Sequence, residues 1–146
     1  MNKELANSVN VYLSNAGVMF IKLHNVHWNV IGKEFKSVHE YLQVIYEEFS
    51  LILDDVAEIL KMEGVYPRAS LKDYLEVATI KEIESKDYSV EEVLKITVDD
   101  LTAMQTLANE IREFADKEGH FELTDLMQAQ LTSYKKHIWF IKSMLK

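Results

Sequence analysis

The feature that most constrains the fold of this chain is its scarcity of residues that interrupt helices. Its 146 residues include one proline and four glycines, the two residue types that most disfavour helix interiors. Apolar side chains recur every three or four residues over long stretches, which places them on one face of a helix. The sequence therefore predicts an all-α protein built from a few long helices.

The first two long helices lie close together in the sequence. One spans about residues 5–30 and ends near Gly32, and the other spans about residues 35–62 and ends at Gly64, with Pro67 just beyond. Because only a few residues join them, the two helices should pack side by side in antiparallel orientation.

A long connection, residues 64–89, separates this pair from the next. Ser70 with Asp73 three residues later has the form of a capping box, and it predicts a short helix through the segment YLEVA. A four-helix bundle with such a long crossover in its middle has ferritin-like connectivity.

The last two long helices have similar boundary signals. A second capping box, Ser89 with Glu92, opens the third helix, which ends at Gly119, and the fourth spans about residues 123–145. The apolar faces are wider than a coiled-coil seam, which disfavours a coiled coil. We expect one ferritin-like domain covering residues 1–146.

Composition limits the classes of function. The chain has no cysteine, so any metal site must use imidazole and carboxylate groups. The net charge of −8 and the absence of a Lys-rich tail disfavour DNA binding, although bound cations could still bridge to DNA. No signal-peptide pattern and no apolar run of the roughly 18 residues that span a membrane are present, so a cytoplasmic protein is expected.

One face of the second predicted helix carries a polar stripe within an arc of about 100° on a helical wheel. Its members are His39, Gln43, Glu47, Ser50, Asp54 and Glu58. The ordinary interpretation of such a stripe is a solvated surface. The alternative is a set of metal ligands.

The spacing of these residues argues against a metal site within one chain. His39 and Asp54 are roughly 22 Å apart along a helix axis, far beyond the reach of one ion. The sequence also lacks the Glu-x-x-His motif of internal di-iron bundles, which disfavours an internal di-iron oxidase. If two copies paired these helices antiparallel about a two-fold axis, His39 of one would lie near Asp54 and Glu58 of the other. His27 could complete a mixed set suited to iron or zinc.

The segments KLHNVHWNVIGKEFKSVHEYLQVIYEEF and DDVAEILKMEG resemble the Dps mini-ferritins. The family pattern is a His-Trp pair in the first helix, Phe-x-x-x-His-Glu at the start of the second, and Asp-x-x-x-Glu before a glycine. LKDYLEVATI and KKHIWFIKSML are similar to the family as well, so the likeness covers essentially the whole chain.

The resemblance implies a hollow dodecamer that oxidises ferrous iron, usually with hydrogen peroxide, and stores ferric mineral. Its di-iron ligands would be His27 and His39 from one chain and Asp54 and Glu58 from the mate. The family's usual aspartate four residues after the second histidine is Gln43 here. Because glutamine carries no charge, it is a poorer ligand for a hard cation, and Glu47 could substitute.

The resemblance also suggests roles for residues around the ligands. Trp28 is either an aromatic that fills space beside the site or an oxidisable ring that gives up an electron. His24 matches no family ligand and is expected in the core or behind the ligands. Trp139 is expected in packing, because it lies on the apolar face of the last predicted helix. His120 and His137 are expected at the surface or capping a helix.

Acidic residues near the start of the last helix line the three-fold iron entries in the family. Asp125 stands at the matching position, with Glu122 and Glu118 nearby. A ring of carboxylates would raise the local concentration of ferrous iron, whereas acids in a first helical turn are also ordinary.

The function expected is therefore iron storage with ferroxidase activity and protection against oxidative stress. Two other functions remain open. One is a metal-binding shell in which Gln43 impairs oxidation, and the other is a DNA-compacting protein.

Overall fold

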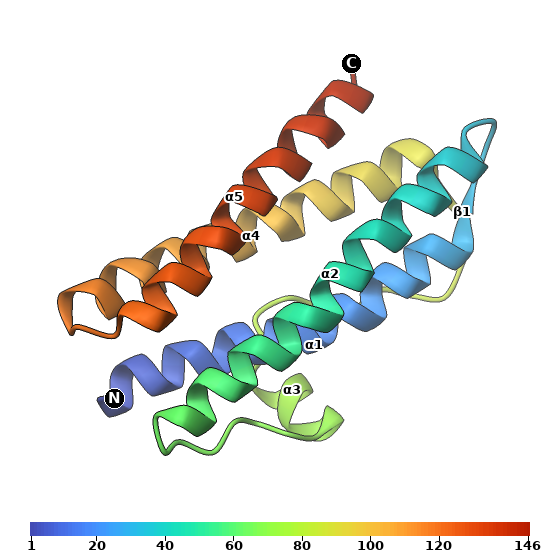
Figure 1. Cartoon of the computed structure of the whole chain (residues 1–146). Helices are drawn as coiled ribbons and strands as arrows, with labels where there is room; N and C mark the ends of the chain where they lie inside the picture. The colour runs from blue at the N-terminus through green and yellow to red at the C-terminus, as the bar shows by residue number, and fades with distance from the viewer.

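The computed structural model describes residues 1–146. The long helices are α1 (Lys3–Asn29), α2 (Phe35–Met62), α4 (Val90–Lys117) and α5 (Phe121–Met144), and the crossover carries the short helix α3 (Leu71–Val77). Figure 1 shows two antiparallel pairs, α1 with α2 and α4 with α5, joined by the crossover. The prediction of an all-α bundle of four long helices with a long crossover that contains a short helix is confirmed.

Side-chain caps explain where the predicted helices begin. The hydroxyl of Ser89 accepts from the backbone N–H of Glu92, and the Glu92 carboxylate accepts from the N–H of Ser89, so this capping box is complete. At α3, Ser70 accepts from the N–H of Asp73, but the reciprocal bond is absent. Asp73 instead lies 4.0 Å from the guanidinium of Arg68.

A short strand pair, which periodicity does not predict, joins the ends of the two helix pairs. β1 (Val30–Ile31) pairs in parallel with β2 (Tyr88–Ser89), in the register Val30 to Tyr88. The chain therefore leaves α1 in extended conformation at Val30, before the expected end at Gly32. This pairing places the end of α1 beside the start of α4.

The core is one cluster of 33 buried apolar residues, to which all four long helices contribute. A small polar group lies within it, where the phenol of Tyr12 on α1 contacts Gln130 and Tyr134 on α5 by hydrogen bonds. Burial of this group is tolerated because its polar atoms are paired. None of the helices combines the length and apolar character needed to cross a membrane.

The crossover is anchored on α1 at two places. The side-chain oxygen of Asn15, itself buried, accepts from the backbone N–H groups of Thr79 and Ile80, at 2.8 and 3.2 Å. Two residues later, Gly17 leaves room for the ring of Tyr74 from α3, since a Cβ atom at Gly17 would lie 2.5 Å from that ring. These contacts hold the crossover beside the first helix.

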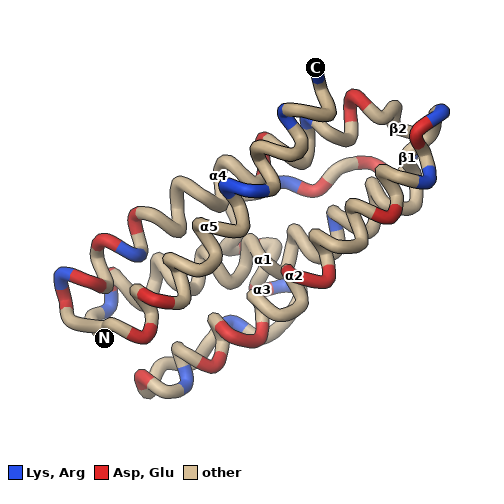
Figure 2. The backbone as a smooth tube through the Cα atoms, turned by 45° about the horizontal axis from the view of Figure 1, so that its top comes forward, with Lys and Arg blue, Asp and Glu red and all other residues tan.

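Charged residues of both signs are interleaved along the helices (Figure 2). One pair is largely buried, where the ammonium of Lys22 on α1 lies 2.7 Å from the carboxylate of Asp100 on α4. Burial raises the pKa of Asp100 despite this partner. The pair therefore links the two helix pairs at a cost in desolvation.

Candidate metal centre

Two imidazole rings meet where α1 ends and α2 begins. His27 lies in the last turn of α1 and His39 near the start of α2. Their rings stack with centroids 3.7 Å apart and planes 10° from parallel. The structure therefore brings these two predicted ligands together within one chain.

Reciprocal hydrogen bonds to the backbone hold the two rings in place. Nδ1 of His27 lies 2.6 Å from the carbonyl oxygen of His39, and Nδ1 of His39 lies 2.7 Å from the carbonyl oxygen of His27. A carbonyl oxygen only accepts, so each Nδ1 carries the proton and donates. Each neutral ring consequently keeps a lone pair on Nε2, the arrangement expected of a metal-ligating histidine.

The surroundings of His27 favour the neutral ring that a metal requires. His27 is 5% exposed, and this burial is the main reason that its pKa lies below the ordinary value. The hydrogen bond to the His39 backbone acts in the opposite direction and is outweighed. Neutral imidazole is the form that binds metal ions.

The predicted carboxylate ligands lie elsewhere on α2. Asp54 and Glu58 are exposed and form no hydrogen bond or ion pair within the chain. No group of three or more His, Asp or Glu side chains lies close enough to hold a metal ion. One chain therefore supplies a pair of imidazoles and a separate pair of free carboxylates.

Gln43 and Glu47 lie on the α2 face between these two groups. Both are exposed, and the Gln43 amide donates to the Glu47 carboxylate over 2.9 Å. The amide oxygen of Gln43 and the second oxygen of Glu47 remain free. Both oxygens are available to an ion, but only that of Glu47 belongs to a charged group.

An aromatic cluster surrounds the imidazole pair, and it includes a residue that sequence reasoning missed. Tyr46 stacks on His24 with ring centroids 3.8 Å apart and meets the ring of His27 edge-on at 5.2 Å. It lies two turns after His39 on the same side of α2, a signal that was available in the sequence. His24 also bonds through Nδ1 to the carbonyl of Phe20 at 2.6 Å, which holds its ring within this cluster.

Trp28 lies at the outer edge of this cluster. It is 65% exposed, and its ring lies 5.3 Å from the ring of His24. The ring of Trp28 is therefore linked to the ring of His27 only indirectly, through the rings of His24 and Tyr46. Within one chain, Trp28 does not fill space in the core.

Comparison with known proteins identifies the family. A model of the ferritin-like domain matches residues 6–146. General stress protein 20U of Bacillus subtilis (strain 168) is 33% identical over 145 residues, which cover 99% of each chain. The crystal structure of a Dps protein from Bacillus brevis has a TM-score of 0.94 at 31% identity, with 100% of each chain covered. The chain belongs to the Dps branch of the ferritin-like family.

A third comparison bears on the metal. The Dps structure from Vibrio cholerae O1, described as a member of a broad superfamily of ferritin-like diiron-carboxylate proteins, has a TM-score of 0.94. Its sequence is 28% identical, and the match covers 99% of this chain and 90% of that one. Membership in the Dps family thus places this chain among iron-sequestering mini-ferritins.

The acidic residues that the Dps resemblance assigns to a pore lie in two separate places. Glu122 and Asp125, on α5, line a groove of about 390 Å³ together with Asp55 and Glu58 of α2. Glu118 lies outside this groove, in a different hollow beside α4. The structure therefore brings two of the three residues close to a predicted iron ligand.

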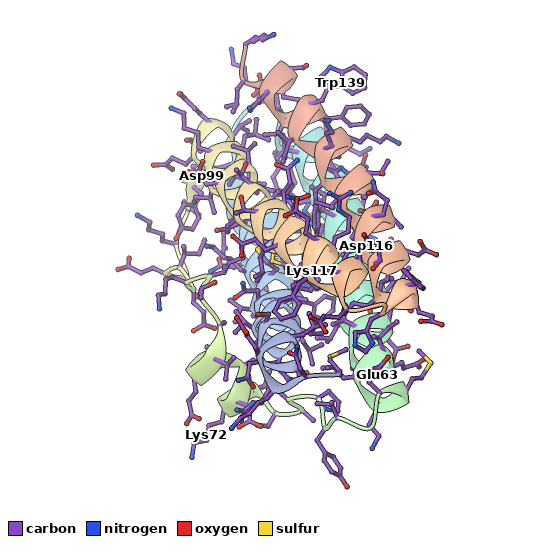
Figure 3. The ribbon with its side chains drawn as sticks, turned by 90° about the vertical axis from the view of Figure 1, so that its left-hand side faces the viewer. Glu63, Lys72, Asp99, Asp116, Lys117 and Trp139 are labelled. Atoms are coloured by element: carbon purple, nitrogen blue, oxygen red, sulfur yellow. The ribbon has the colours of Figure 1, made fainter.

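Two expectations about α5 are wrong. His137 is 4% exposed and buried, because its two ring nitrogens bond to Tyr41 and Glu48 of α2. Trp139 is 65% exposed and projects away from the bundle near the end of α5 (Figure 3). The two residues are two positions apart and therefore lie on nearly opposite sides of α5, so only one of them can face the bundle, and that residue is His137. His120 does lie at the surface end of α5, directly before its first residue.

Proposed function

We propose that the chain assembles into a hollow, cytoplasmic homododecamer that oxidises ferrous iron with hydrogen peroxide and stores the ferric product. The observation that carries this proposal is the His27–His39 pair, whose Nδ1 atoms are engaged and whose Nε2 atoms are free. Its activity would protect against oxidative stress, because it consumes ferrous iron and peroxide together.

The di-iron centre requires two chains. His27 and His39 of one chain would bind iron together with Asp54 and Glu58 of a second copy across a two-fold axis. The absence of a three-ligand cluster within one chain supports this division, as does the exposure of both carboxylates without a partner. A two-fold axis produces two such centres for each pair of chains.

The residues of the centre have distinct roles in the reaction. The imidazoles hold ferrous iron through neutral nitrogen, and the carboxylates compensate the charge that increases on oxidation. Two ferrous ions each give one electron to one peroxide molecule, which takes up two protons and leaves as two waters. Transfer of both electrons at one place avoids release of hydroxyl radical.

Ferrous ions would reach the centre past the acidic residues of α5. Asp125 and Glu122, with Glu118 further away, would attract cations at the shell opening. The groove that Glu122 and Asp125 share with Glu58 supports this route. Zinc suits the same mixture of imidazole and carboxylate, and we expect it to compete with iron.

A second candidate function rests on Gln43. With an amide in place of a carboxylate, the second iron would bind weakly, and the shell would sequester metal with little ferroxidase activity. DNA compaction remains disfavoured by the net charge of −8 and the interleaved charges.

Particle mass and stopped-flow kinetics test the proposal together. We expect a dodecamer whose ferrous oxidation is faster with hydrogen peroxide than with oxygen, and a loss of at least roughly tenfold in His39→Ala. His120→Ala, a change in a histidine far from the pair, is the control and should retain the rate. A monomer, or an active His39→Ala variant, would contradict the proposal. A dodecamer that binds ferrous iron but does not oxidise it would favour the second candidate.

A further inference from the structure

A second hydrogen-bonded group joins α2 to α5, separate from the imidazole pair. The phenol oxygen of Tyr41 lies 2.7 Å from Nδ1 of His137, and Nε2 of His137 lies 2.9 Å from the carboxylate of Glu48. The hydroxyl of Ser133 donates to the same carboxylate oxygen over 2.9 Å. The chain therefore contains a phenol, an imidazole and a carboxylate in series.

The direction of these hydrogen bonds follows from the carboxylate. Burial alone would raise the pKa of Glu48, but the hydrogen bonds from His137 and Ser133 outweigh burial and keep this pKa below its usual value. The carboxylate only accepts, so Nε2 of His137 carries the proton. In the neutral ring Nδ1 is then the acceptor, and the Tyr41 hydroxyl donates to it.

This arrangement suits oxidation of the Tyr41 phenol. A phenol that loses an electron becomes strongly acidic, and oxidation is easier when a base within hydrogen-bond distance takes the proton at the same time. His137 is that base, and Glu48 stabilises the imidazolium that forms. The Glu48 side chain is 40% exposed, so protons can return from solvent.

The other tyrosines near this region lack such a base. Tyr46 is closer to the imidazole pair, but its hydroxyl has no hydrogen bond within the chain. Tyr12 and Tyr134 bond to each other and to the Gln130 amide, which does not accept a proton at neutral pH. Tyr41 alone has an accepting imidazole, and it stands two residues from His39 on α2, about 3 Å along the helix axis, with its side chain directed to α5 where that of His39 is directed to α1.

We propose that Tyr41 is an electron-donating residue that supplies one of the two electrons for peroxide reduction when only one ferrous ion occupies a centre. This inference rests on the proposed function. One ferrous ion and Tyr41 each lose one electron, and hydrogen peroxide gains both. The phenol proton moves to Nδ1 of His137, two further protons come from solvent, and the products are ferric iron, a neutral tyrosyl radical and two waters. Gln43 makes the singly occupied centre a common state, because it weakens the second iron site.

The test uses anaerobic protein loaded with fewer ferrous ions than centres, mixed with peroxide and freeze-quenched for electron paramagnetic resonance. We expect a tyrosyl signal that narrows when the protein carries ring-deuterated tyrosine. Tyr41→Phe should remove the signal and release hydroxyl radical to a spin trap. His137→Gln should lower the radical yield without loss of the folded particle.

Matched variants make the assignment specific. Tyr46→Phe, the control, should keep the tyrosyl signal, since its phenol has no proton acceptor. A signal that survives Tyr41→Phe and disappears in Tyr46→Phe or Trp28→Phe would overturn the proposal. Ferrous oxidation without any protein radical would overturn it as well and would leave the proposed function intact, whereas absence of ferrous oxidation would refute both.

A metal-free measurement checks the hydrogen-bond direction independently. Nitrogen-15 solid-state spectra of the sedimented protein should show His137 with a protonated Nε2 and an accepting Nδ1. Tyr41→Phe should shift the Nδ1 resonance because it loses its donor. Protonation at Nδ1 in the neutral ring would overturn the proposal without any reference to iron.

Discussion

Gln43 shows how one uncharged side chain affects the proposed centre. Its amide donates to Glu47 over 2.9 Å, so this pair supplies one negative charge where two carboxylates would supply two. We predict that Gln43→Asp binds ferrous iron roughly tenfold more tightly, because one more charge contact near a surface is worth about 1–2 kcal/mol. Anaerobic calorimetry and stopped-flow oxidation with peroxide measure the affinity and the rate.

A control separates direct ligation by the carboxylate introduced at position 43 from general attraction of cations. Ser50→Asp adds the same charge to the same polar face of α2, away from the imidazole pair. If it matched the effect of Gln43→Asp, the gain would reflect charge alone. An unchanged affinity and rate in Gln43→Asp would show that position 43 is not part of the centre.

For single residues, the sequence predicts which side chains form the site better than it predicts what surrounds each of them. The His-Trp and Phe-x-x-x-His-Glu motifs point to His27 and His39, which the structure places in contact. Their crossed hydrogen bonds are not predictable from spacing, because each involves a backbone carbonyl of the other helix. The same limit explains the error at His137, whose burial depends on partners 96 and 89 residues away.

At the scale of elements, the crossover depends on close contact between α3 and α1. A Cβ atom at Gly17 would lie 2.5 Å from the Tyr74 ring, too close for any real side chain. We predict that Gly17→Ala lowers the free energy of unfolding by about 1–3 kcal/mol, since the ring and α3 must shift. Urea unfolding followed by circular dichroism measures the change.

The double variant with Gly17→Ala and Tyr74→Ala tests whether the Tyr74 ring causes the loss of stability. In a Tyr74→Ala background the obstacle is gone, and Gly17→Ala should then stabilise the protein by up to about 1 kcal/mol, because alanine is the better helix former. A loss of stability of the same size in both backgrounds would show that the Tyr74 contact is not responsible.

Helix positions were predictable because their signals are local. The complete capping box of Ser89 and Glu92 is an example, since both partners lie in one turn of chain. The β1–β2 pair was not predictable, because two-residue strands separated by nearly sixty positions leave no periodic pattern. Its parallel pairing depends on the packing of the whole bundle.

At the scale of the whole molecule, the proposed centre requires assembly. Leu51 is 66% exposed on α2, on the same side of the helix as Asp54 and Glu58. We predict that Leu51→Glu prevents two copies of α2 from pairing, so the variant forms smaller particles and loses peroxide-dependent oxidation. Mass photometry and stopped-flow absorbance measure both effects.

Tyr66→Glu is the matched control, since Tyr66 is 84% exposed in the loop after α2 and the same charge is introduced. It should leave particle mass and oxidation unchanged. Full-sized, active Leu51→Glu particles would show that this face of α2 does not take part in the two-fold contact.

The crossed hydrogen bonds of His27 and His39 also bear on the order of events during biogenesis. The chain's own fold orients both rings, so they do not wait for an ion to organise them. In the proposed assembly, a newly folded subunit would therefore be able to dimerise in iron-starved conditions. On that proposal, empty shells would accumulate before iron becomes available, and the first ferrous ions would bind at centres that are already formed.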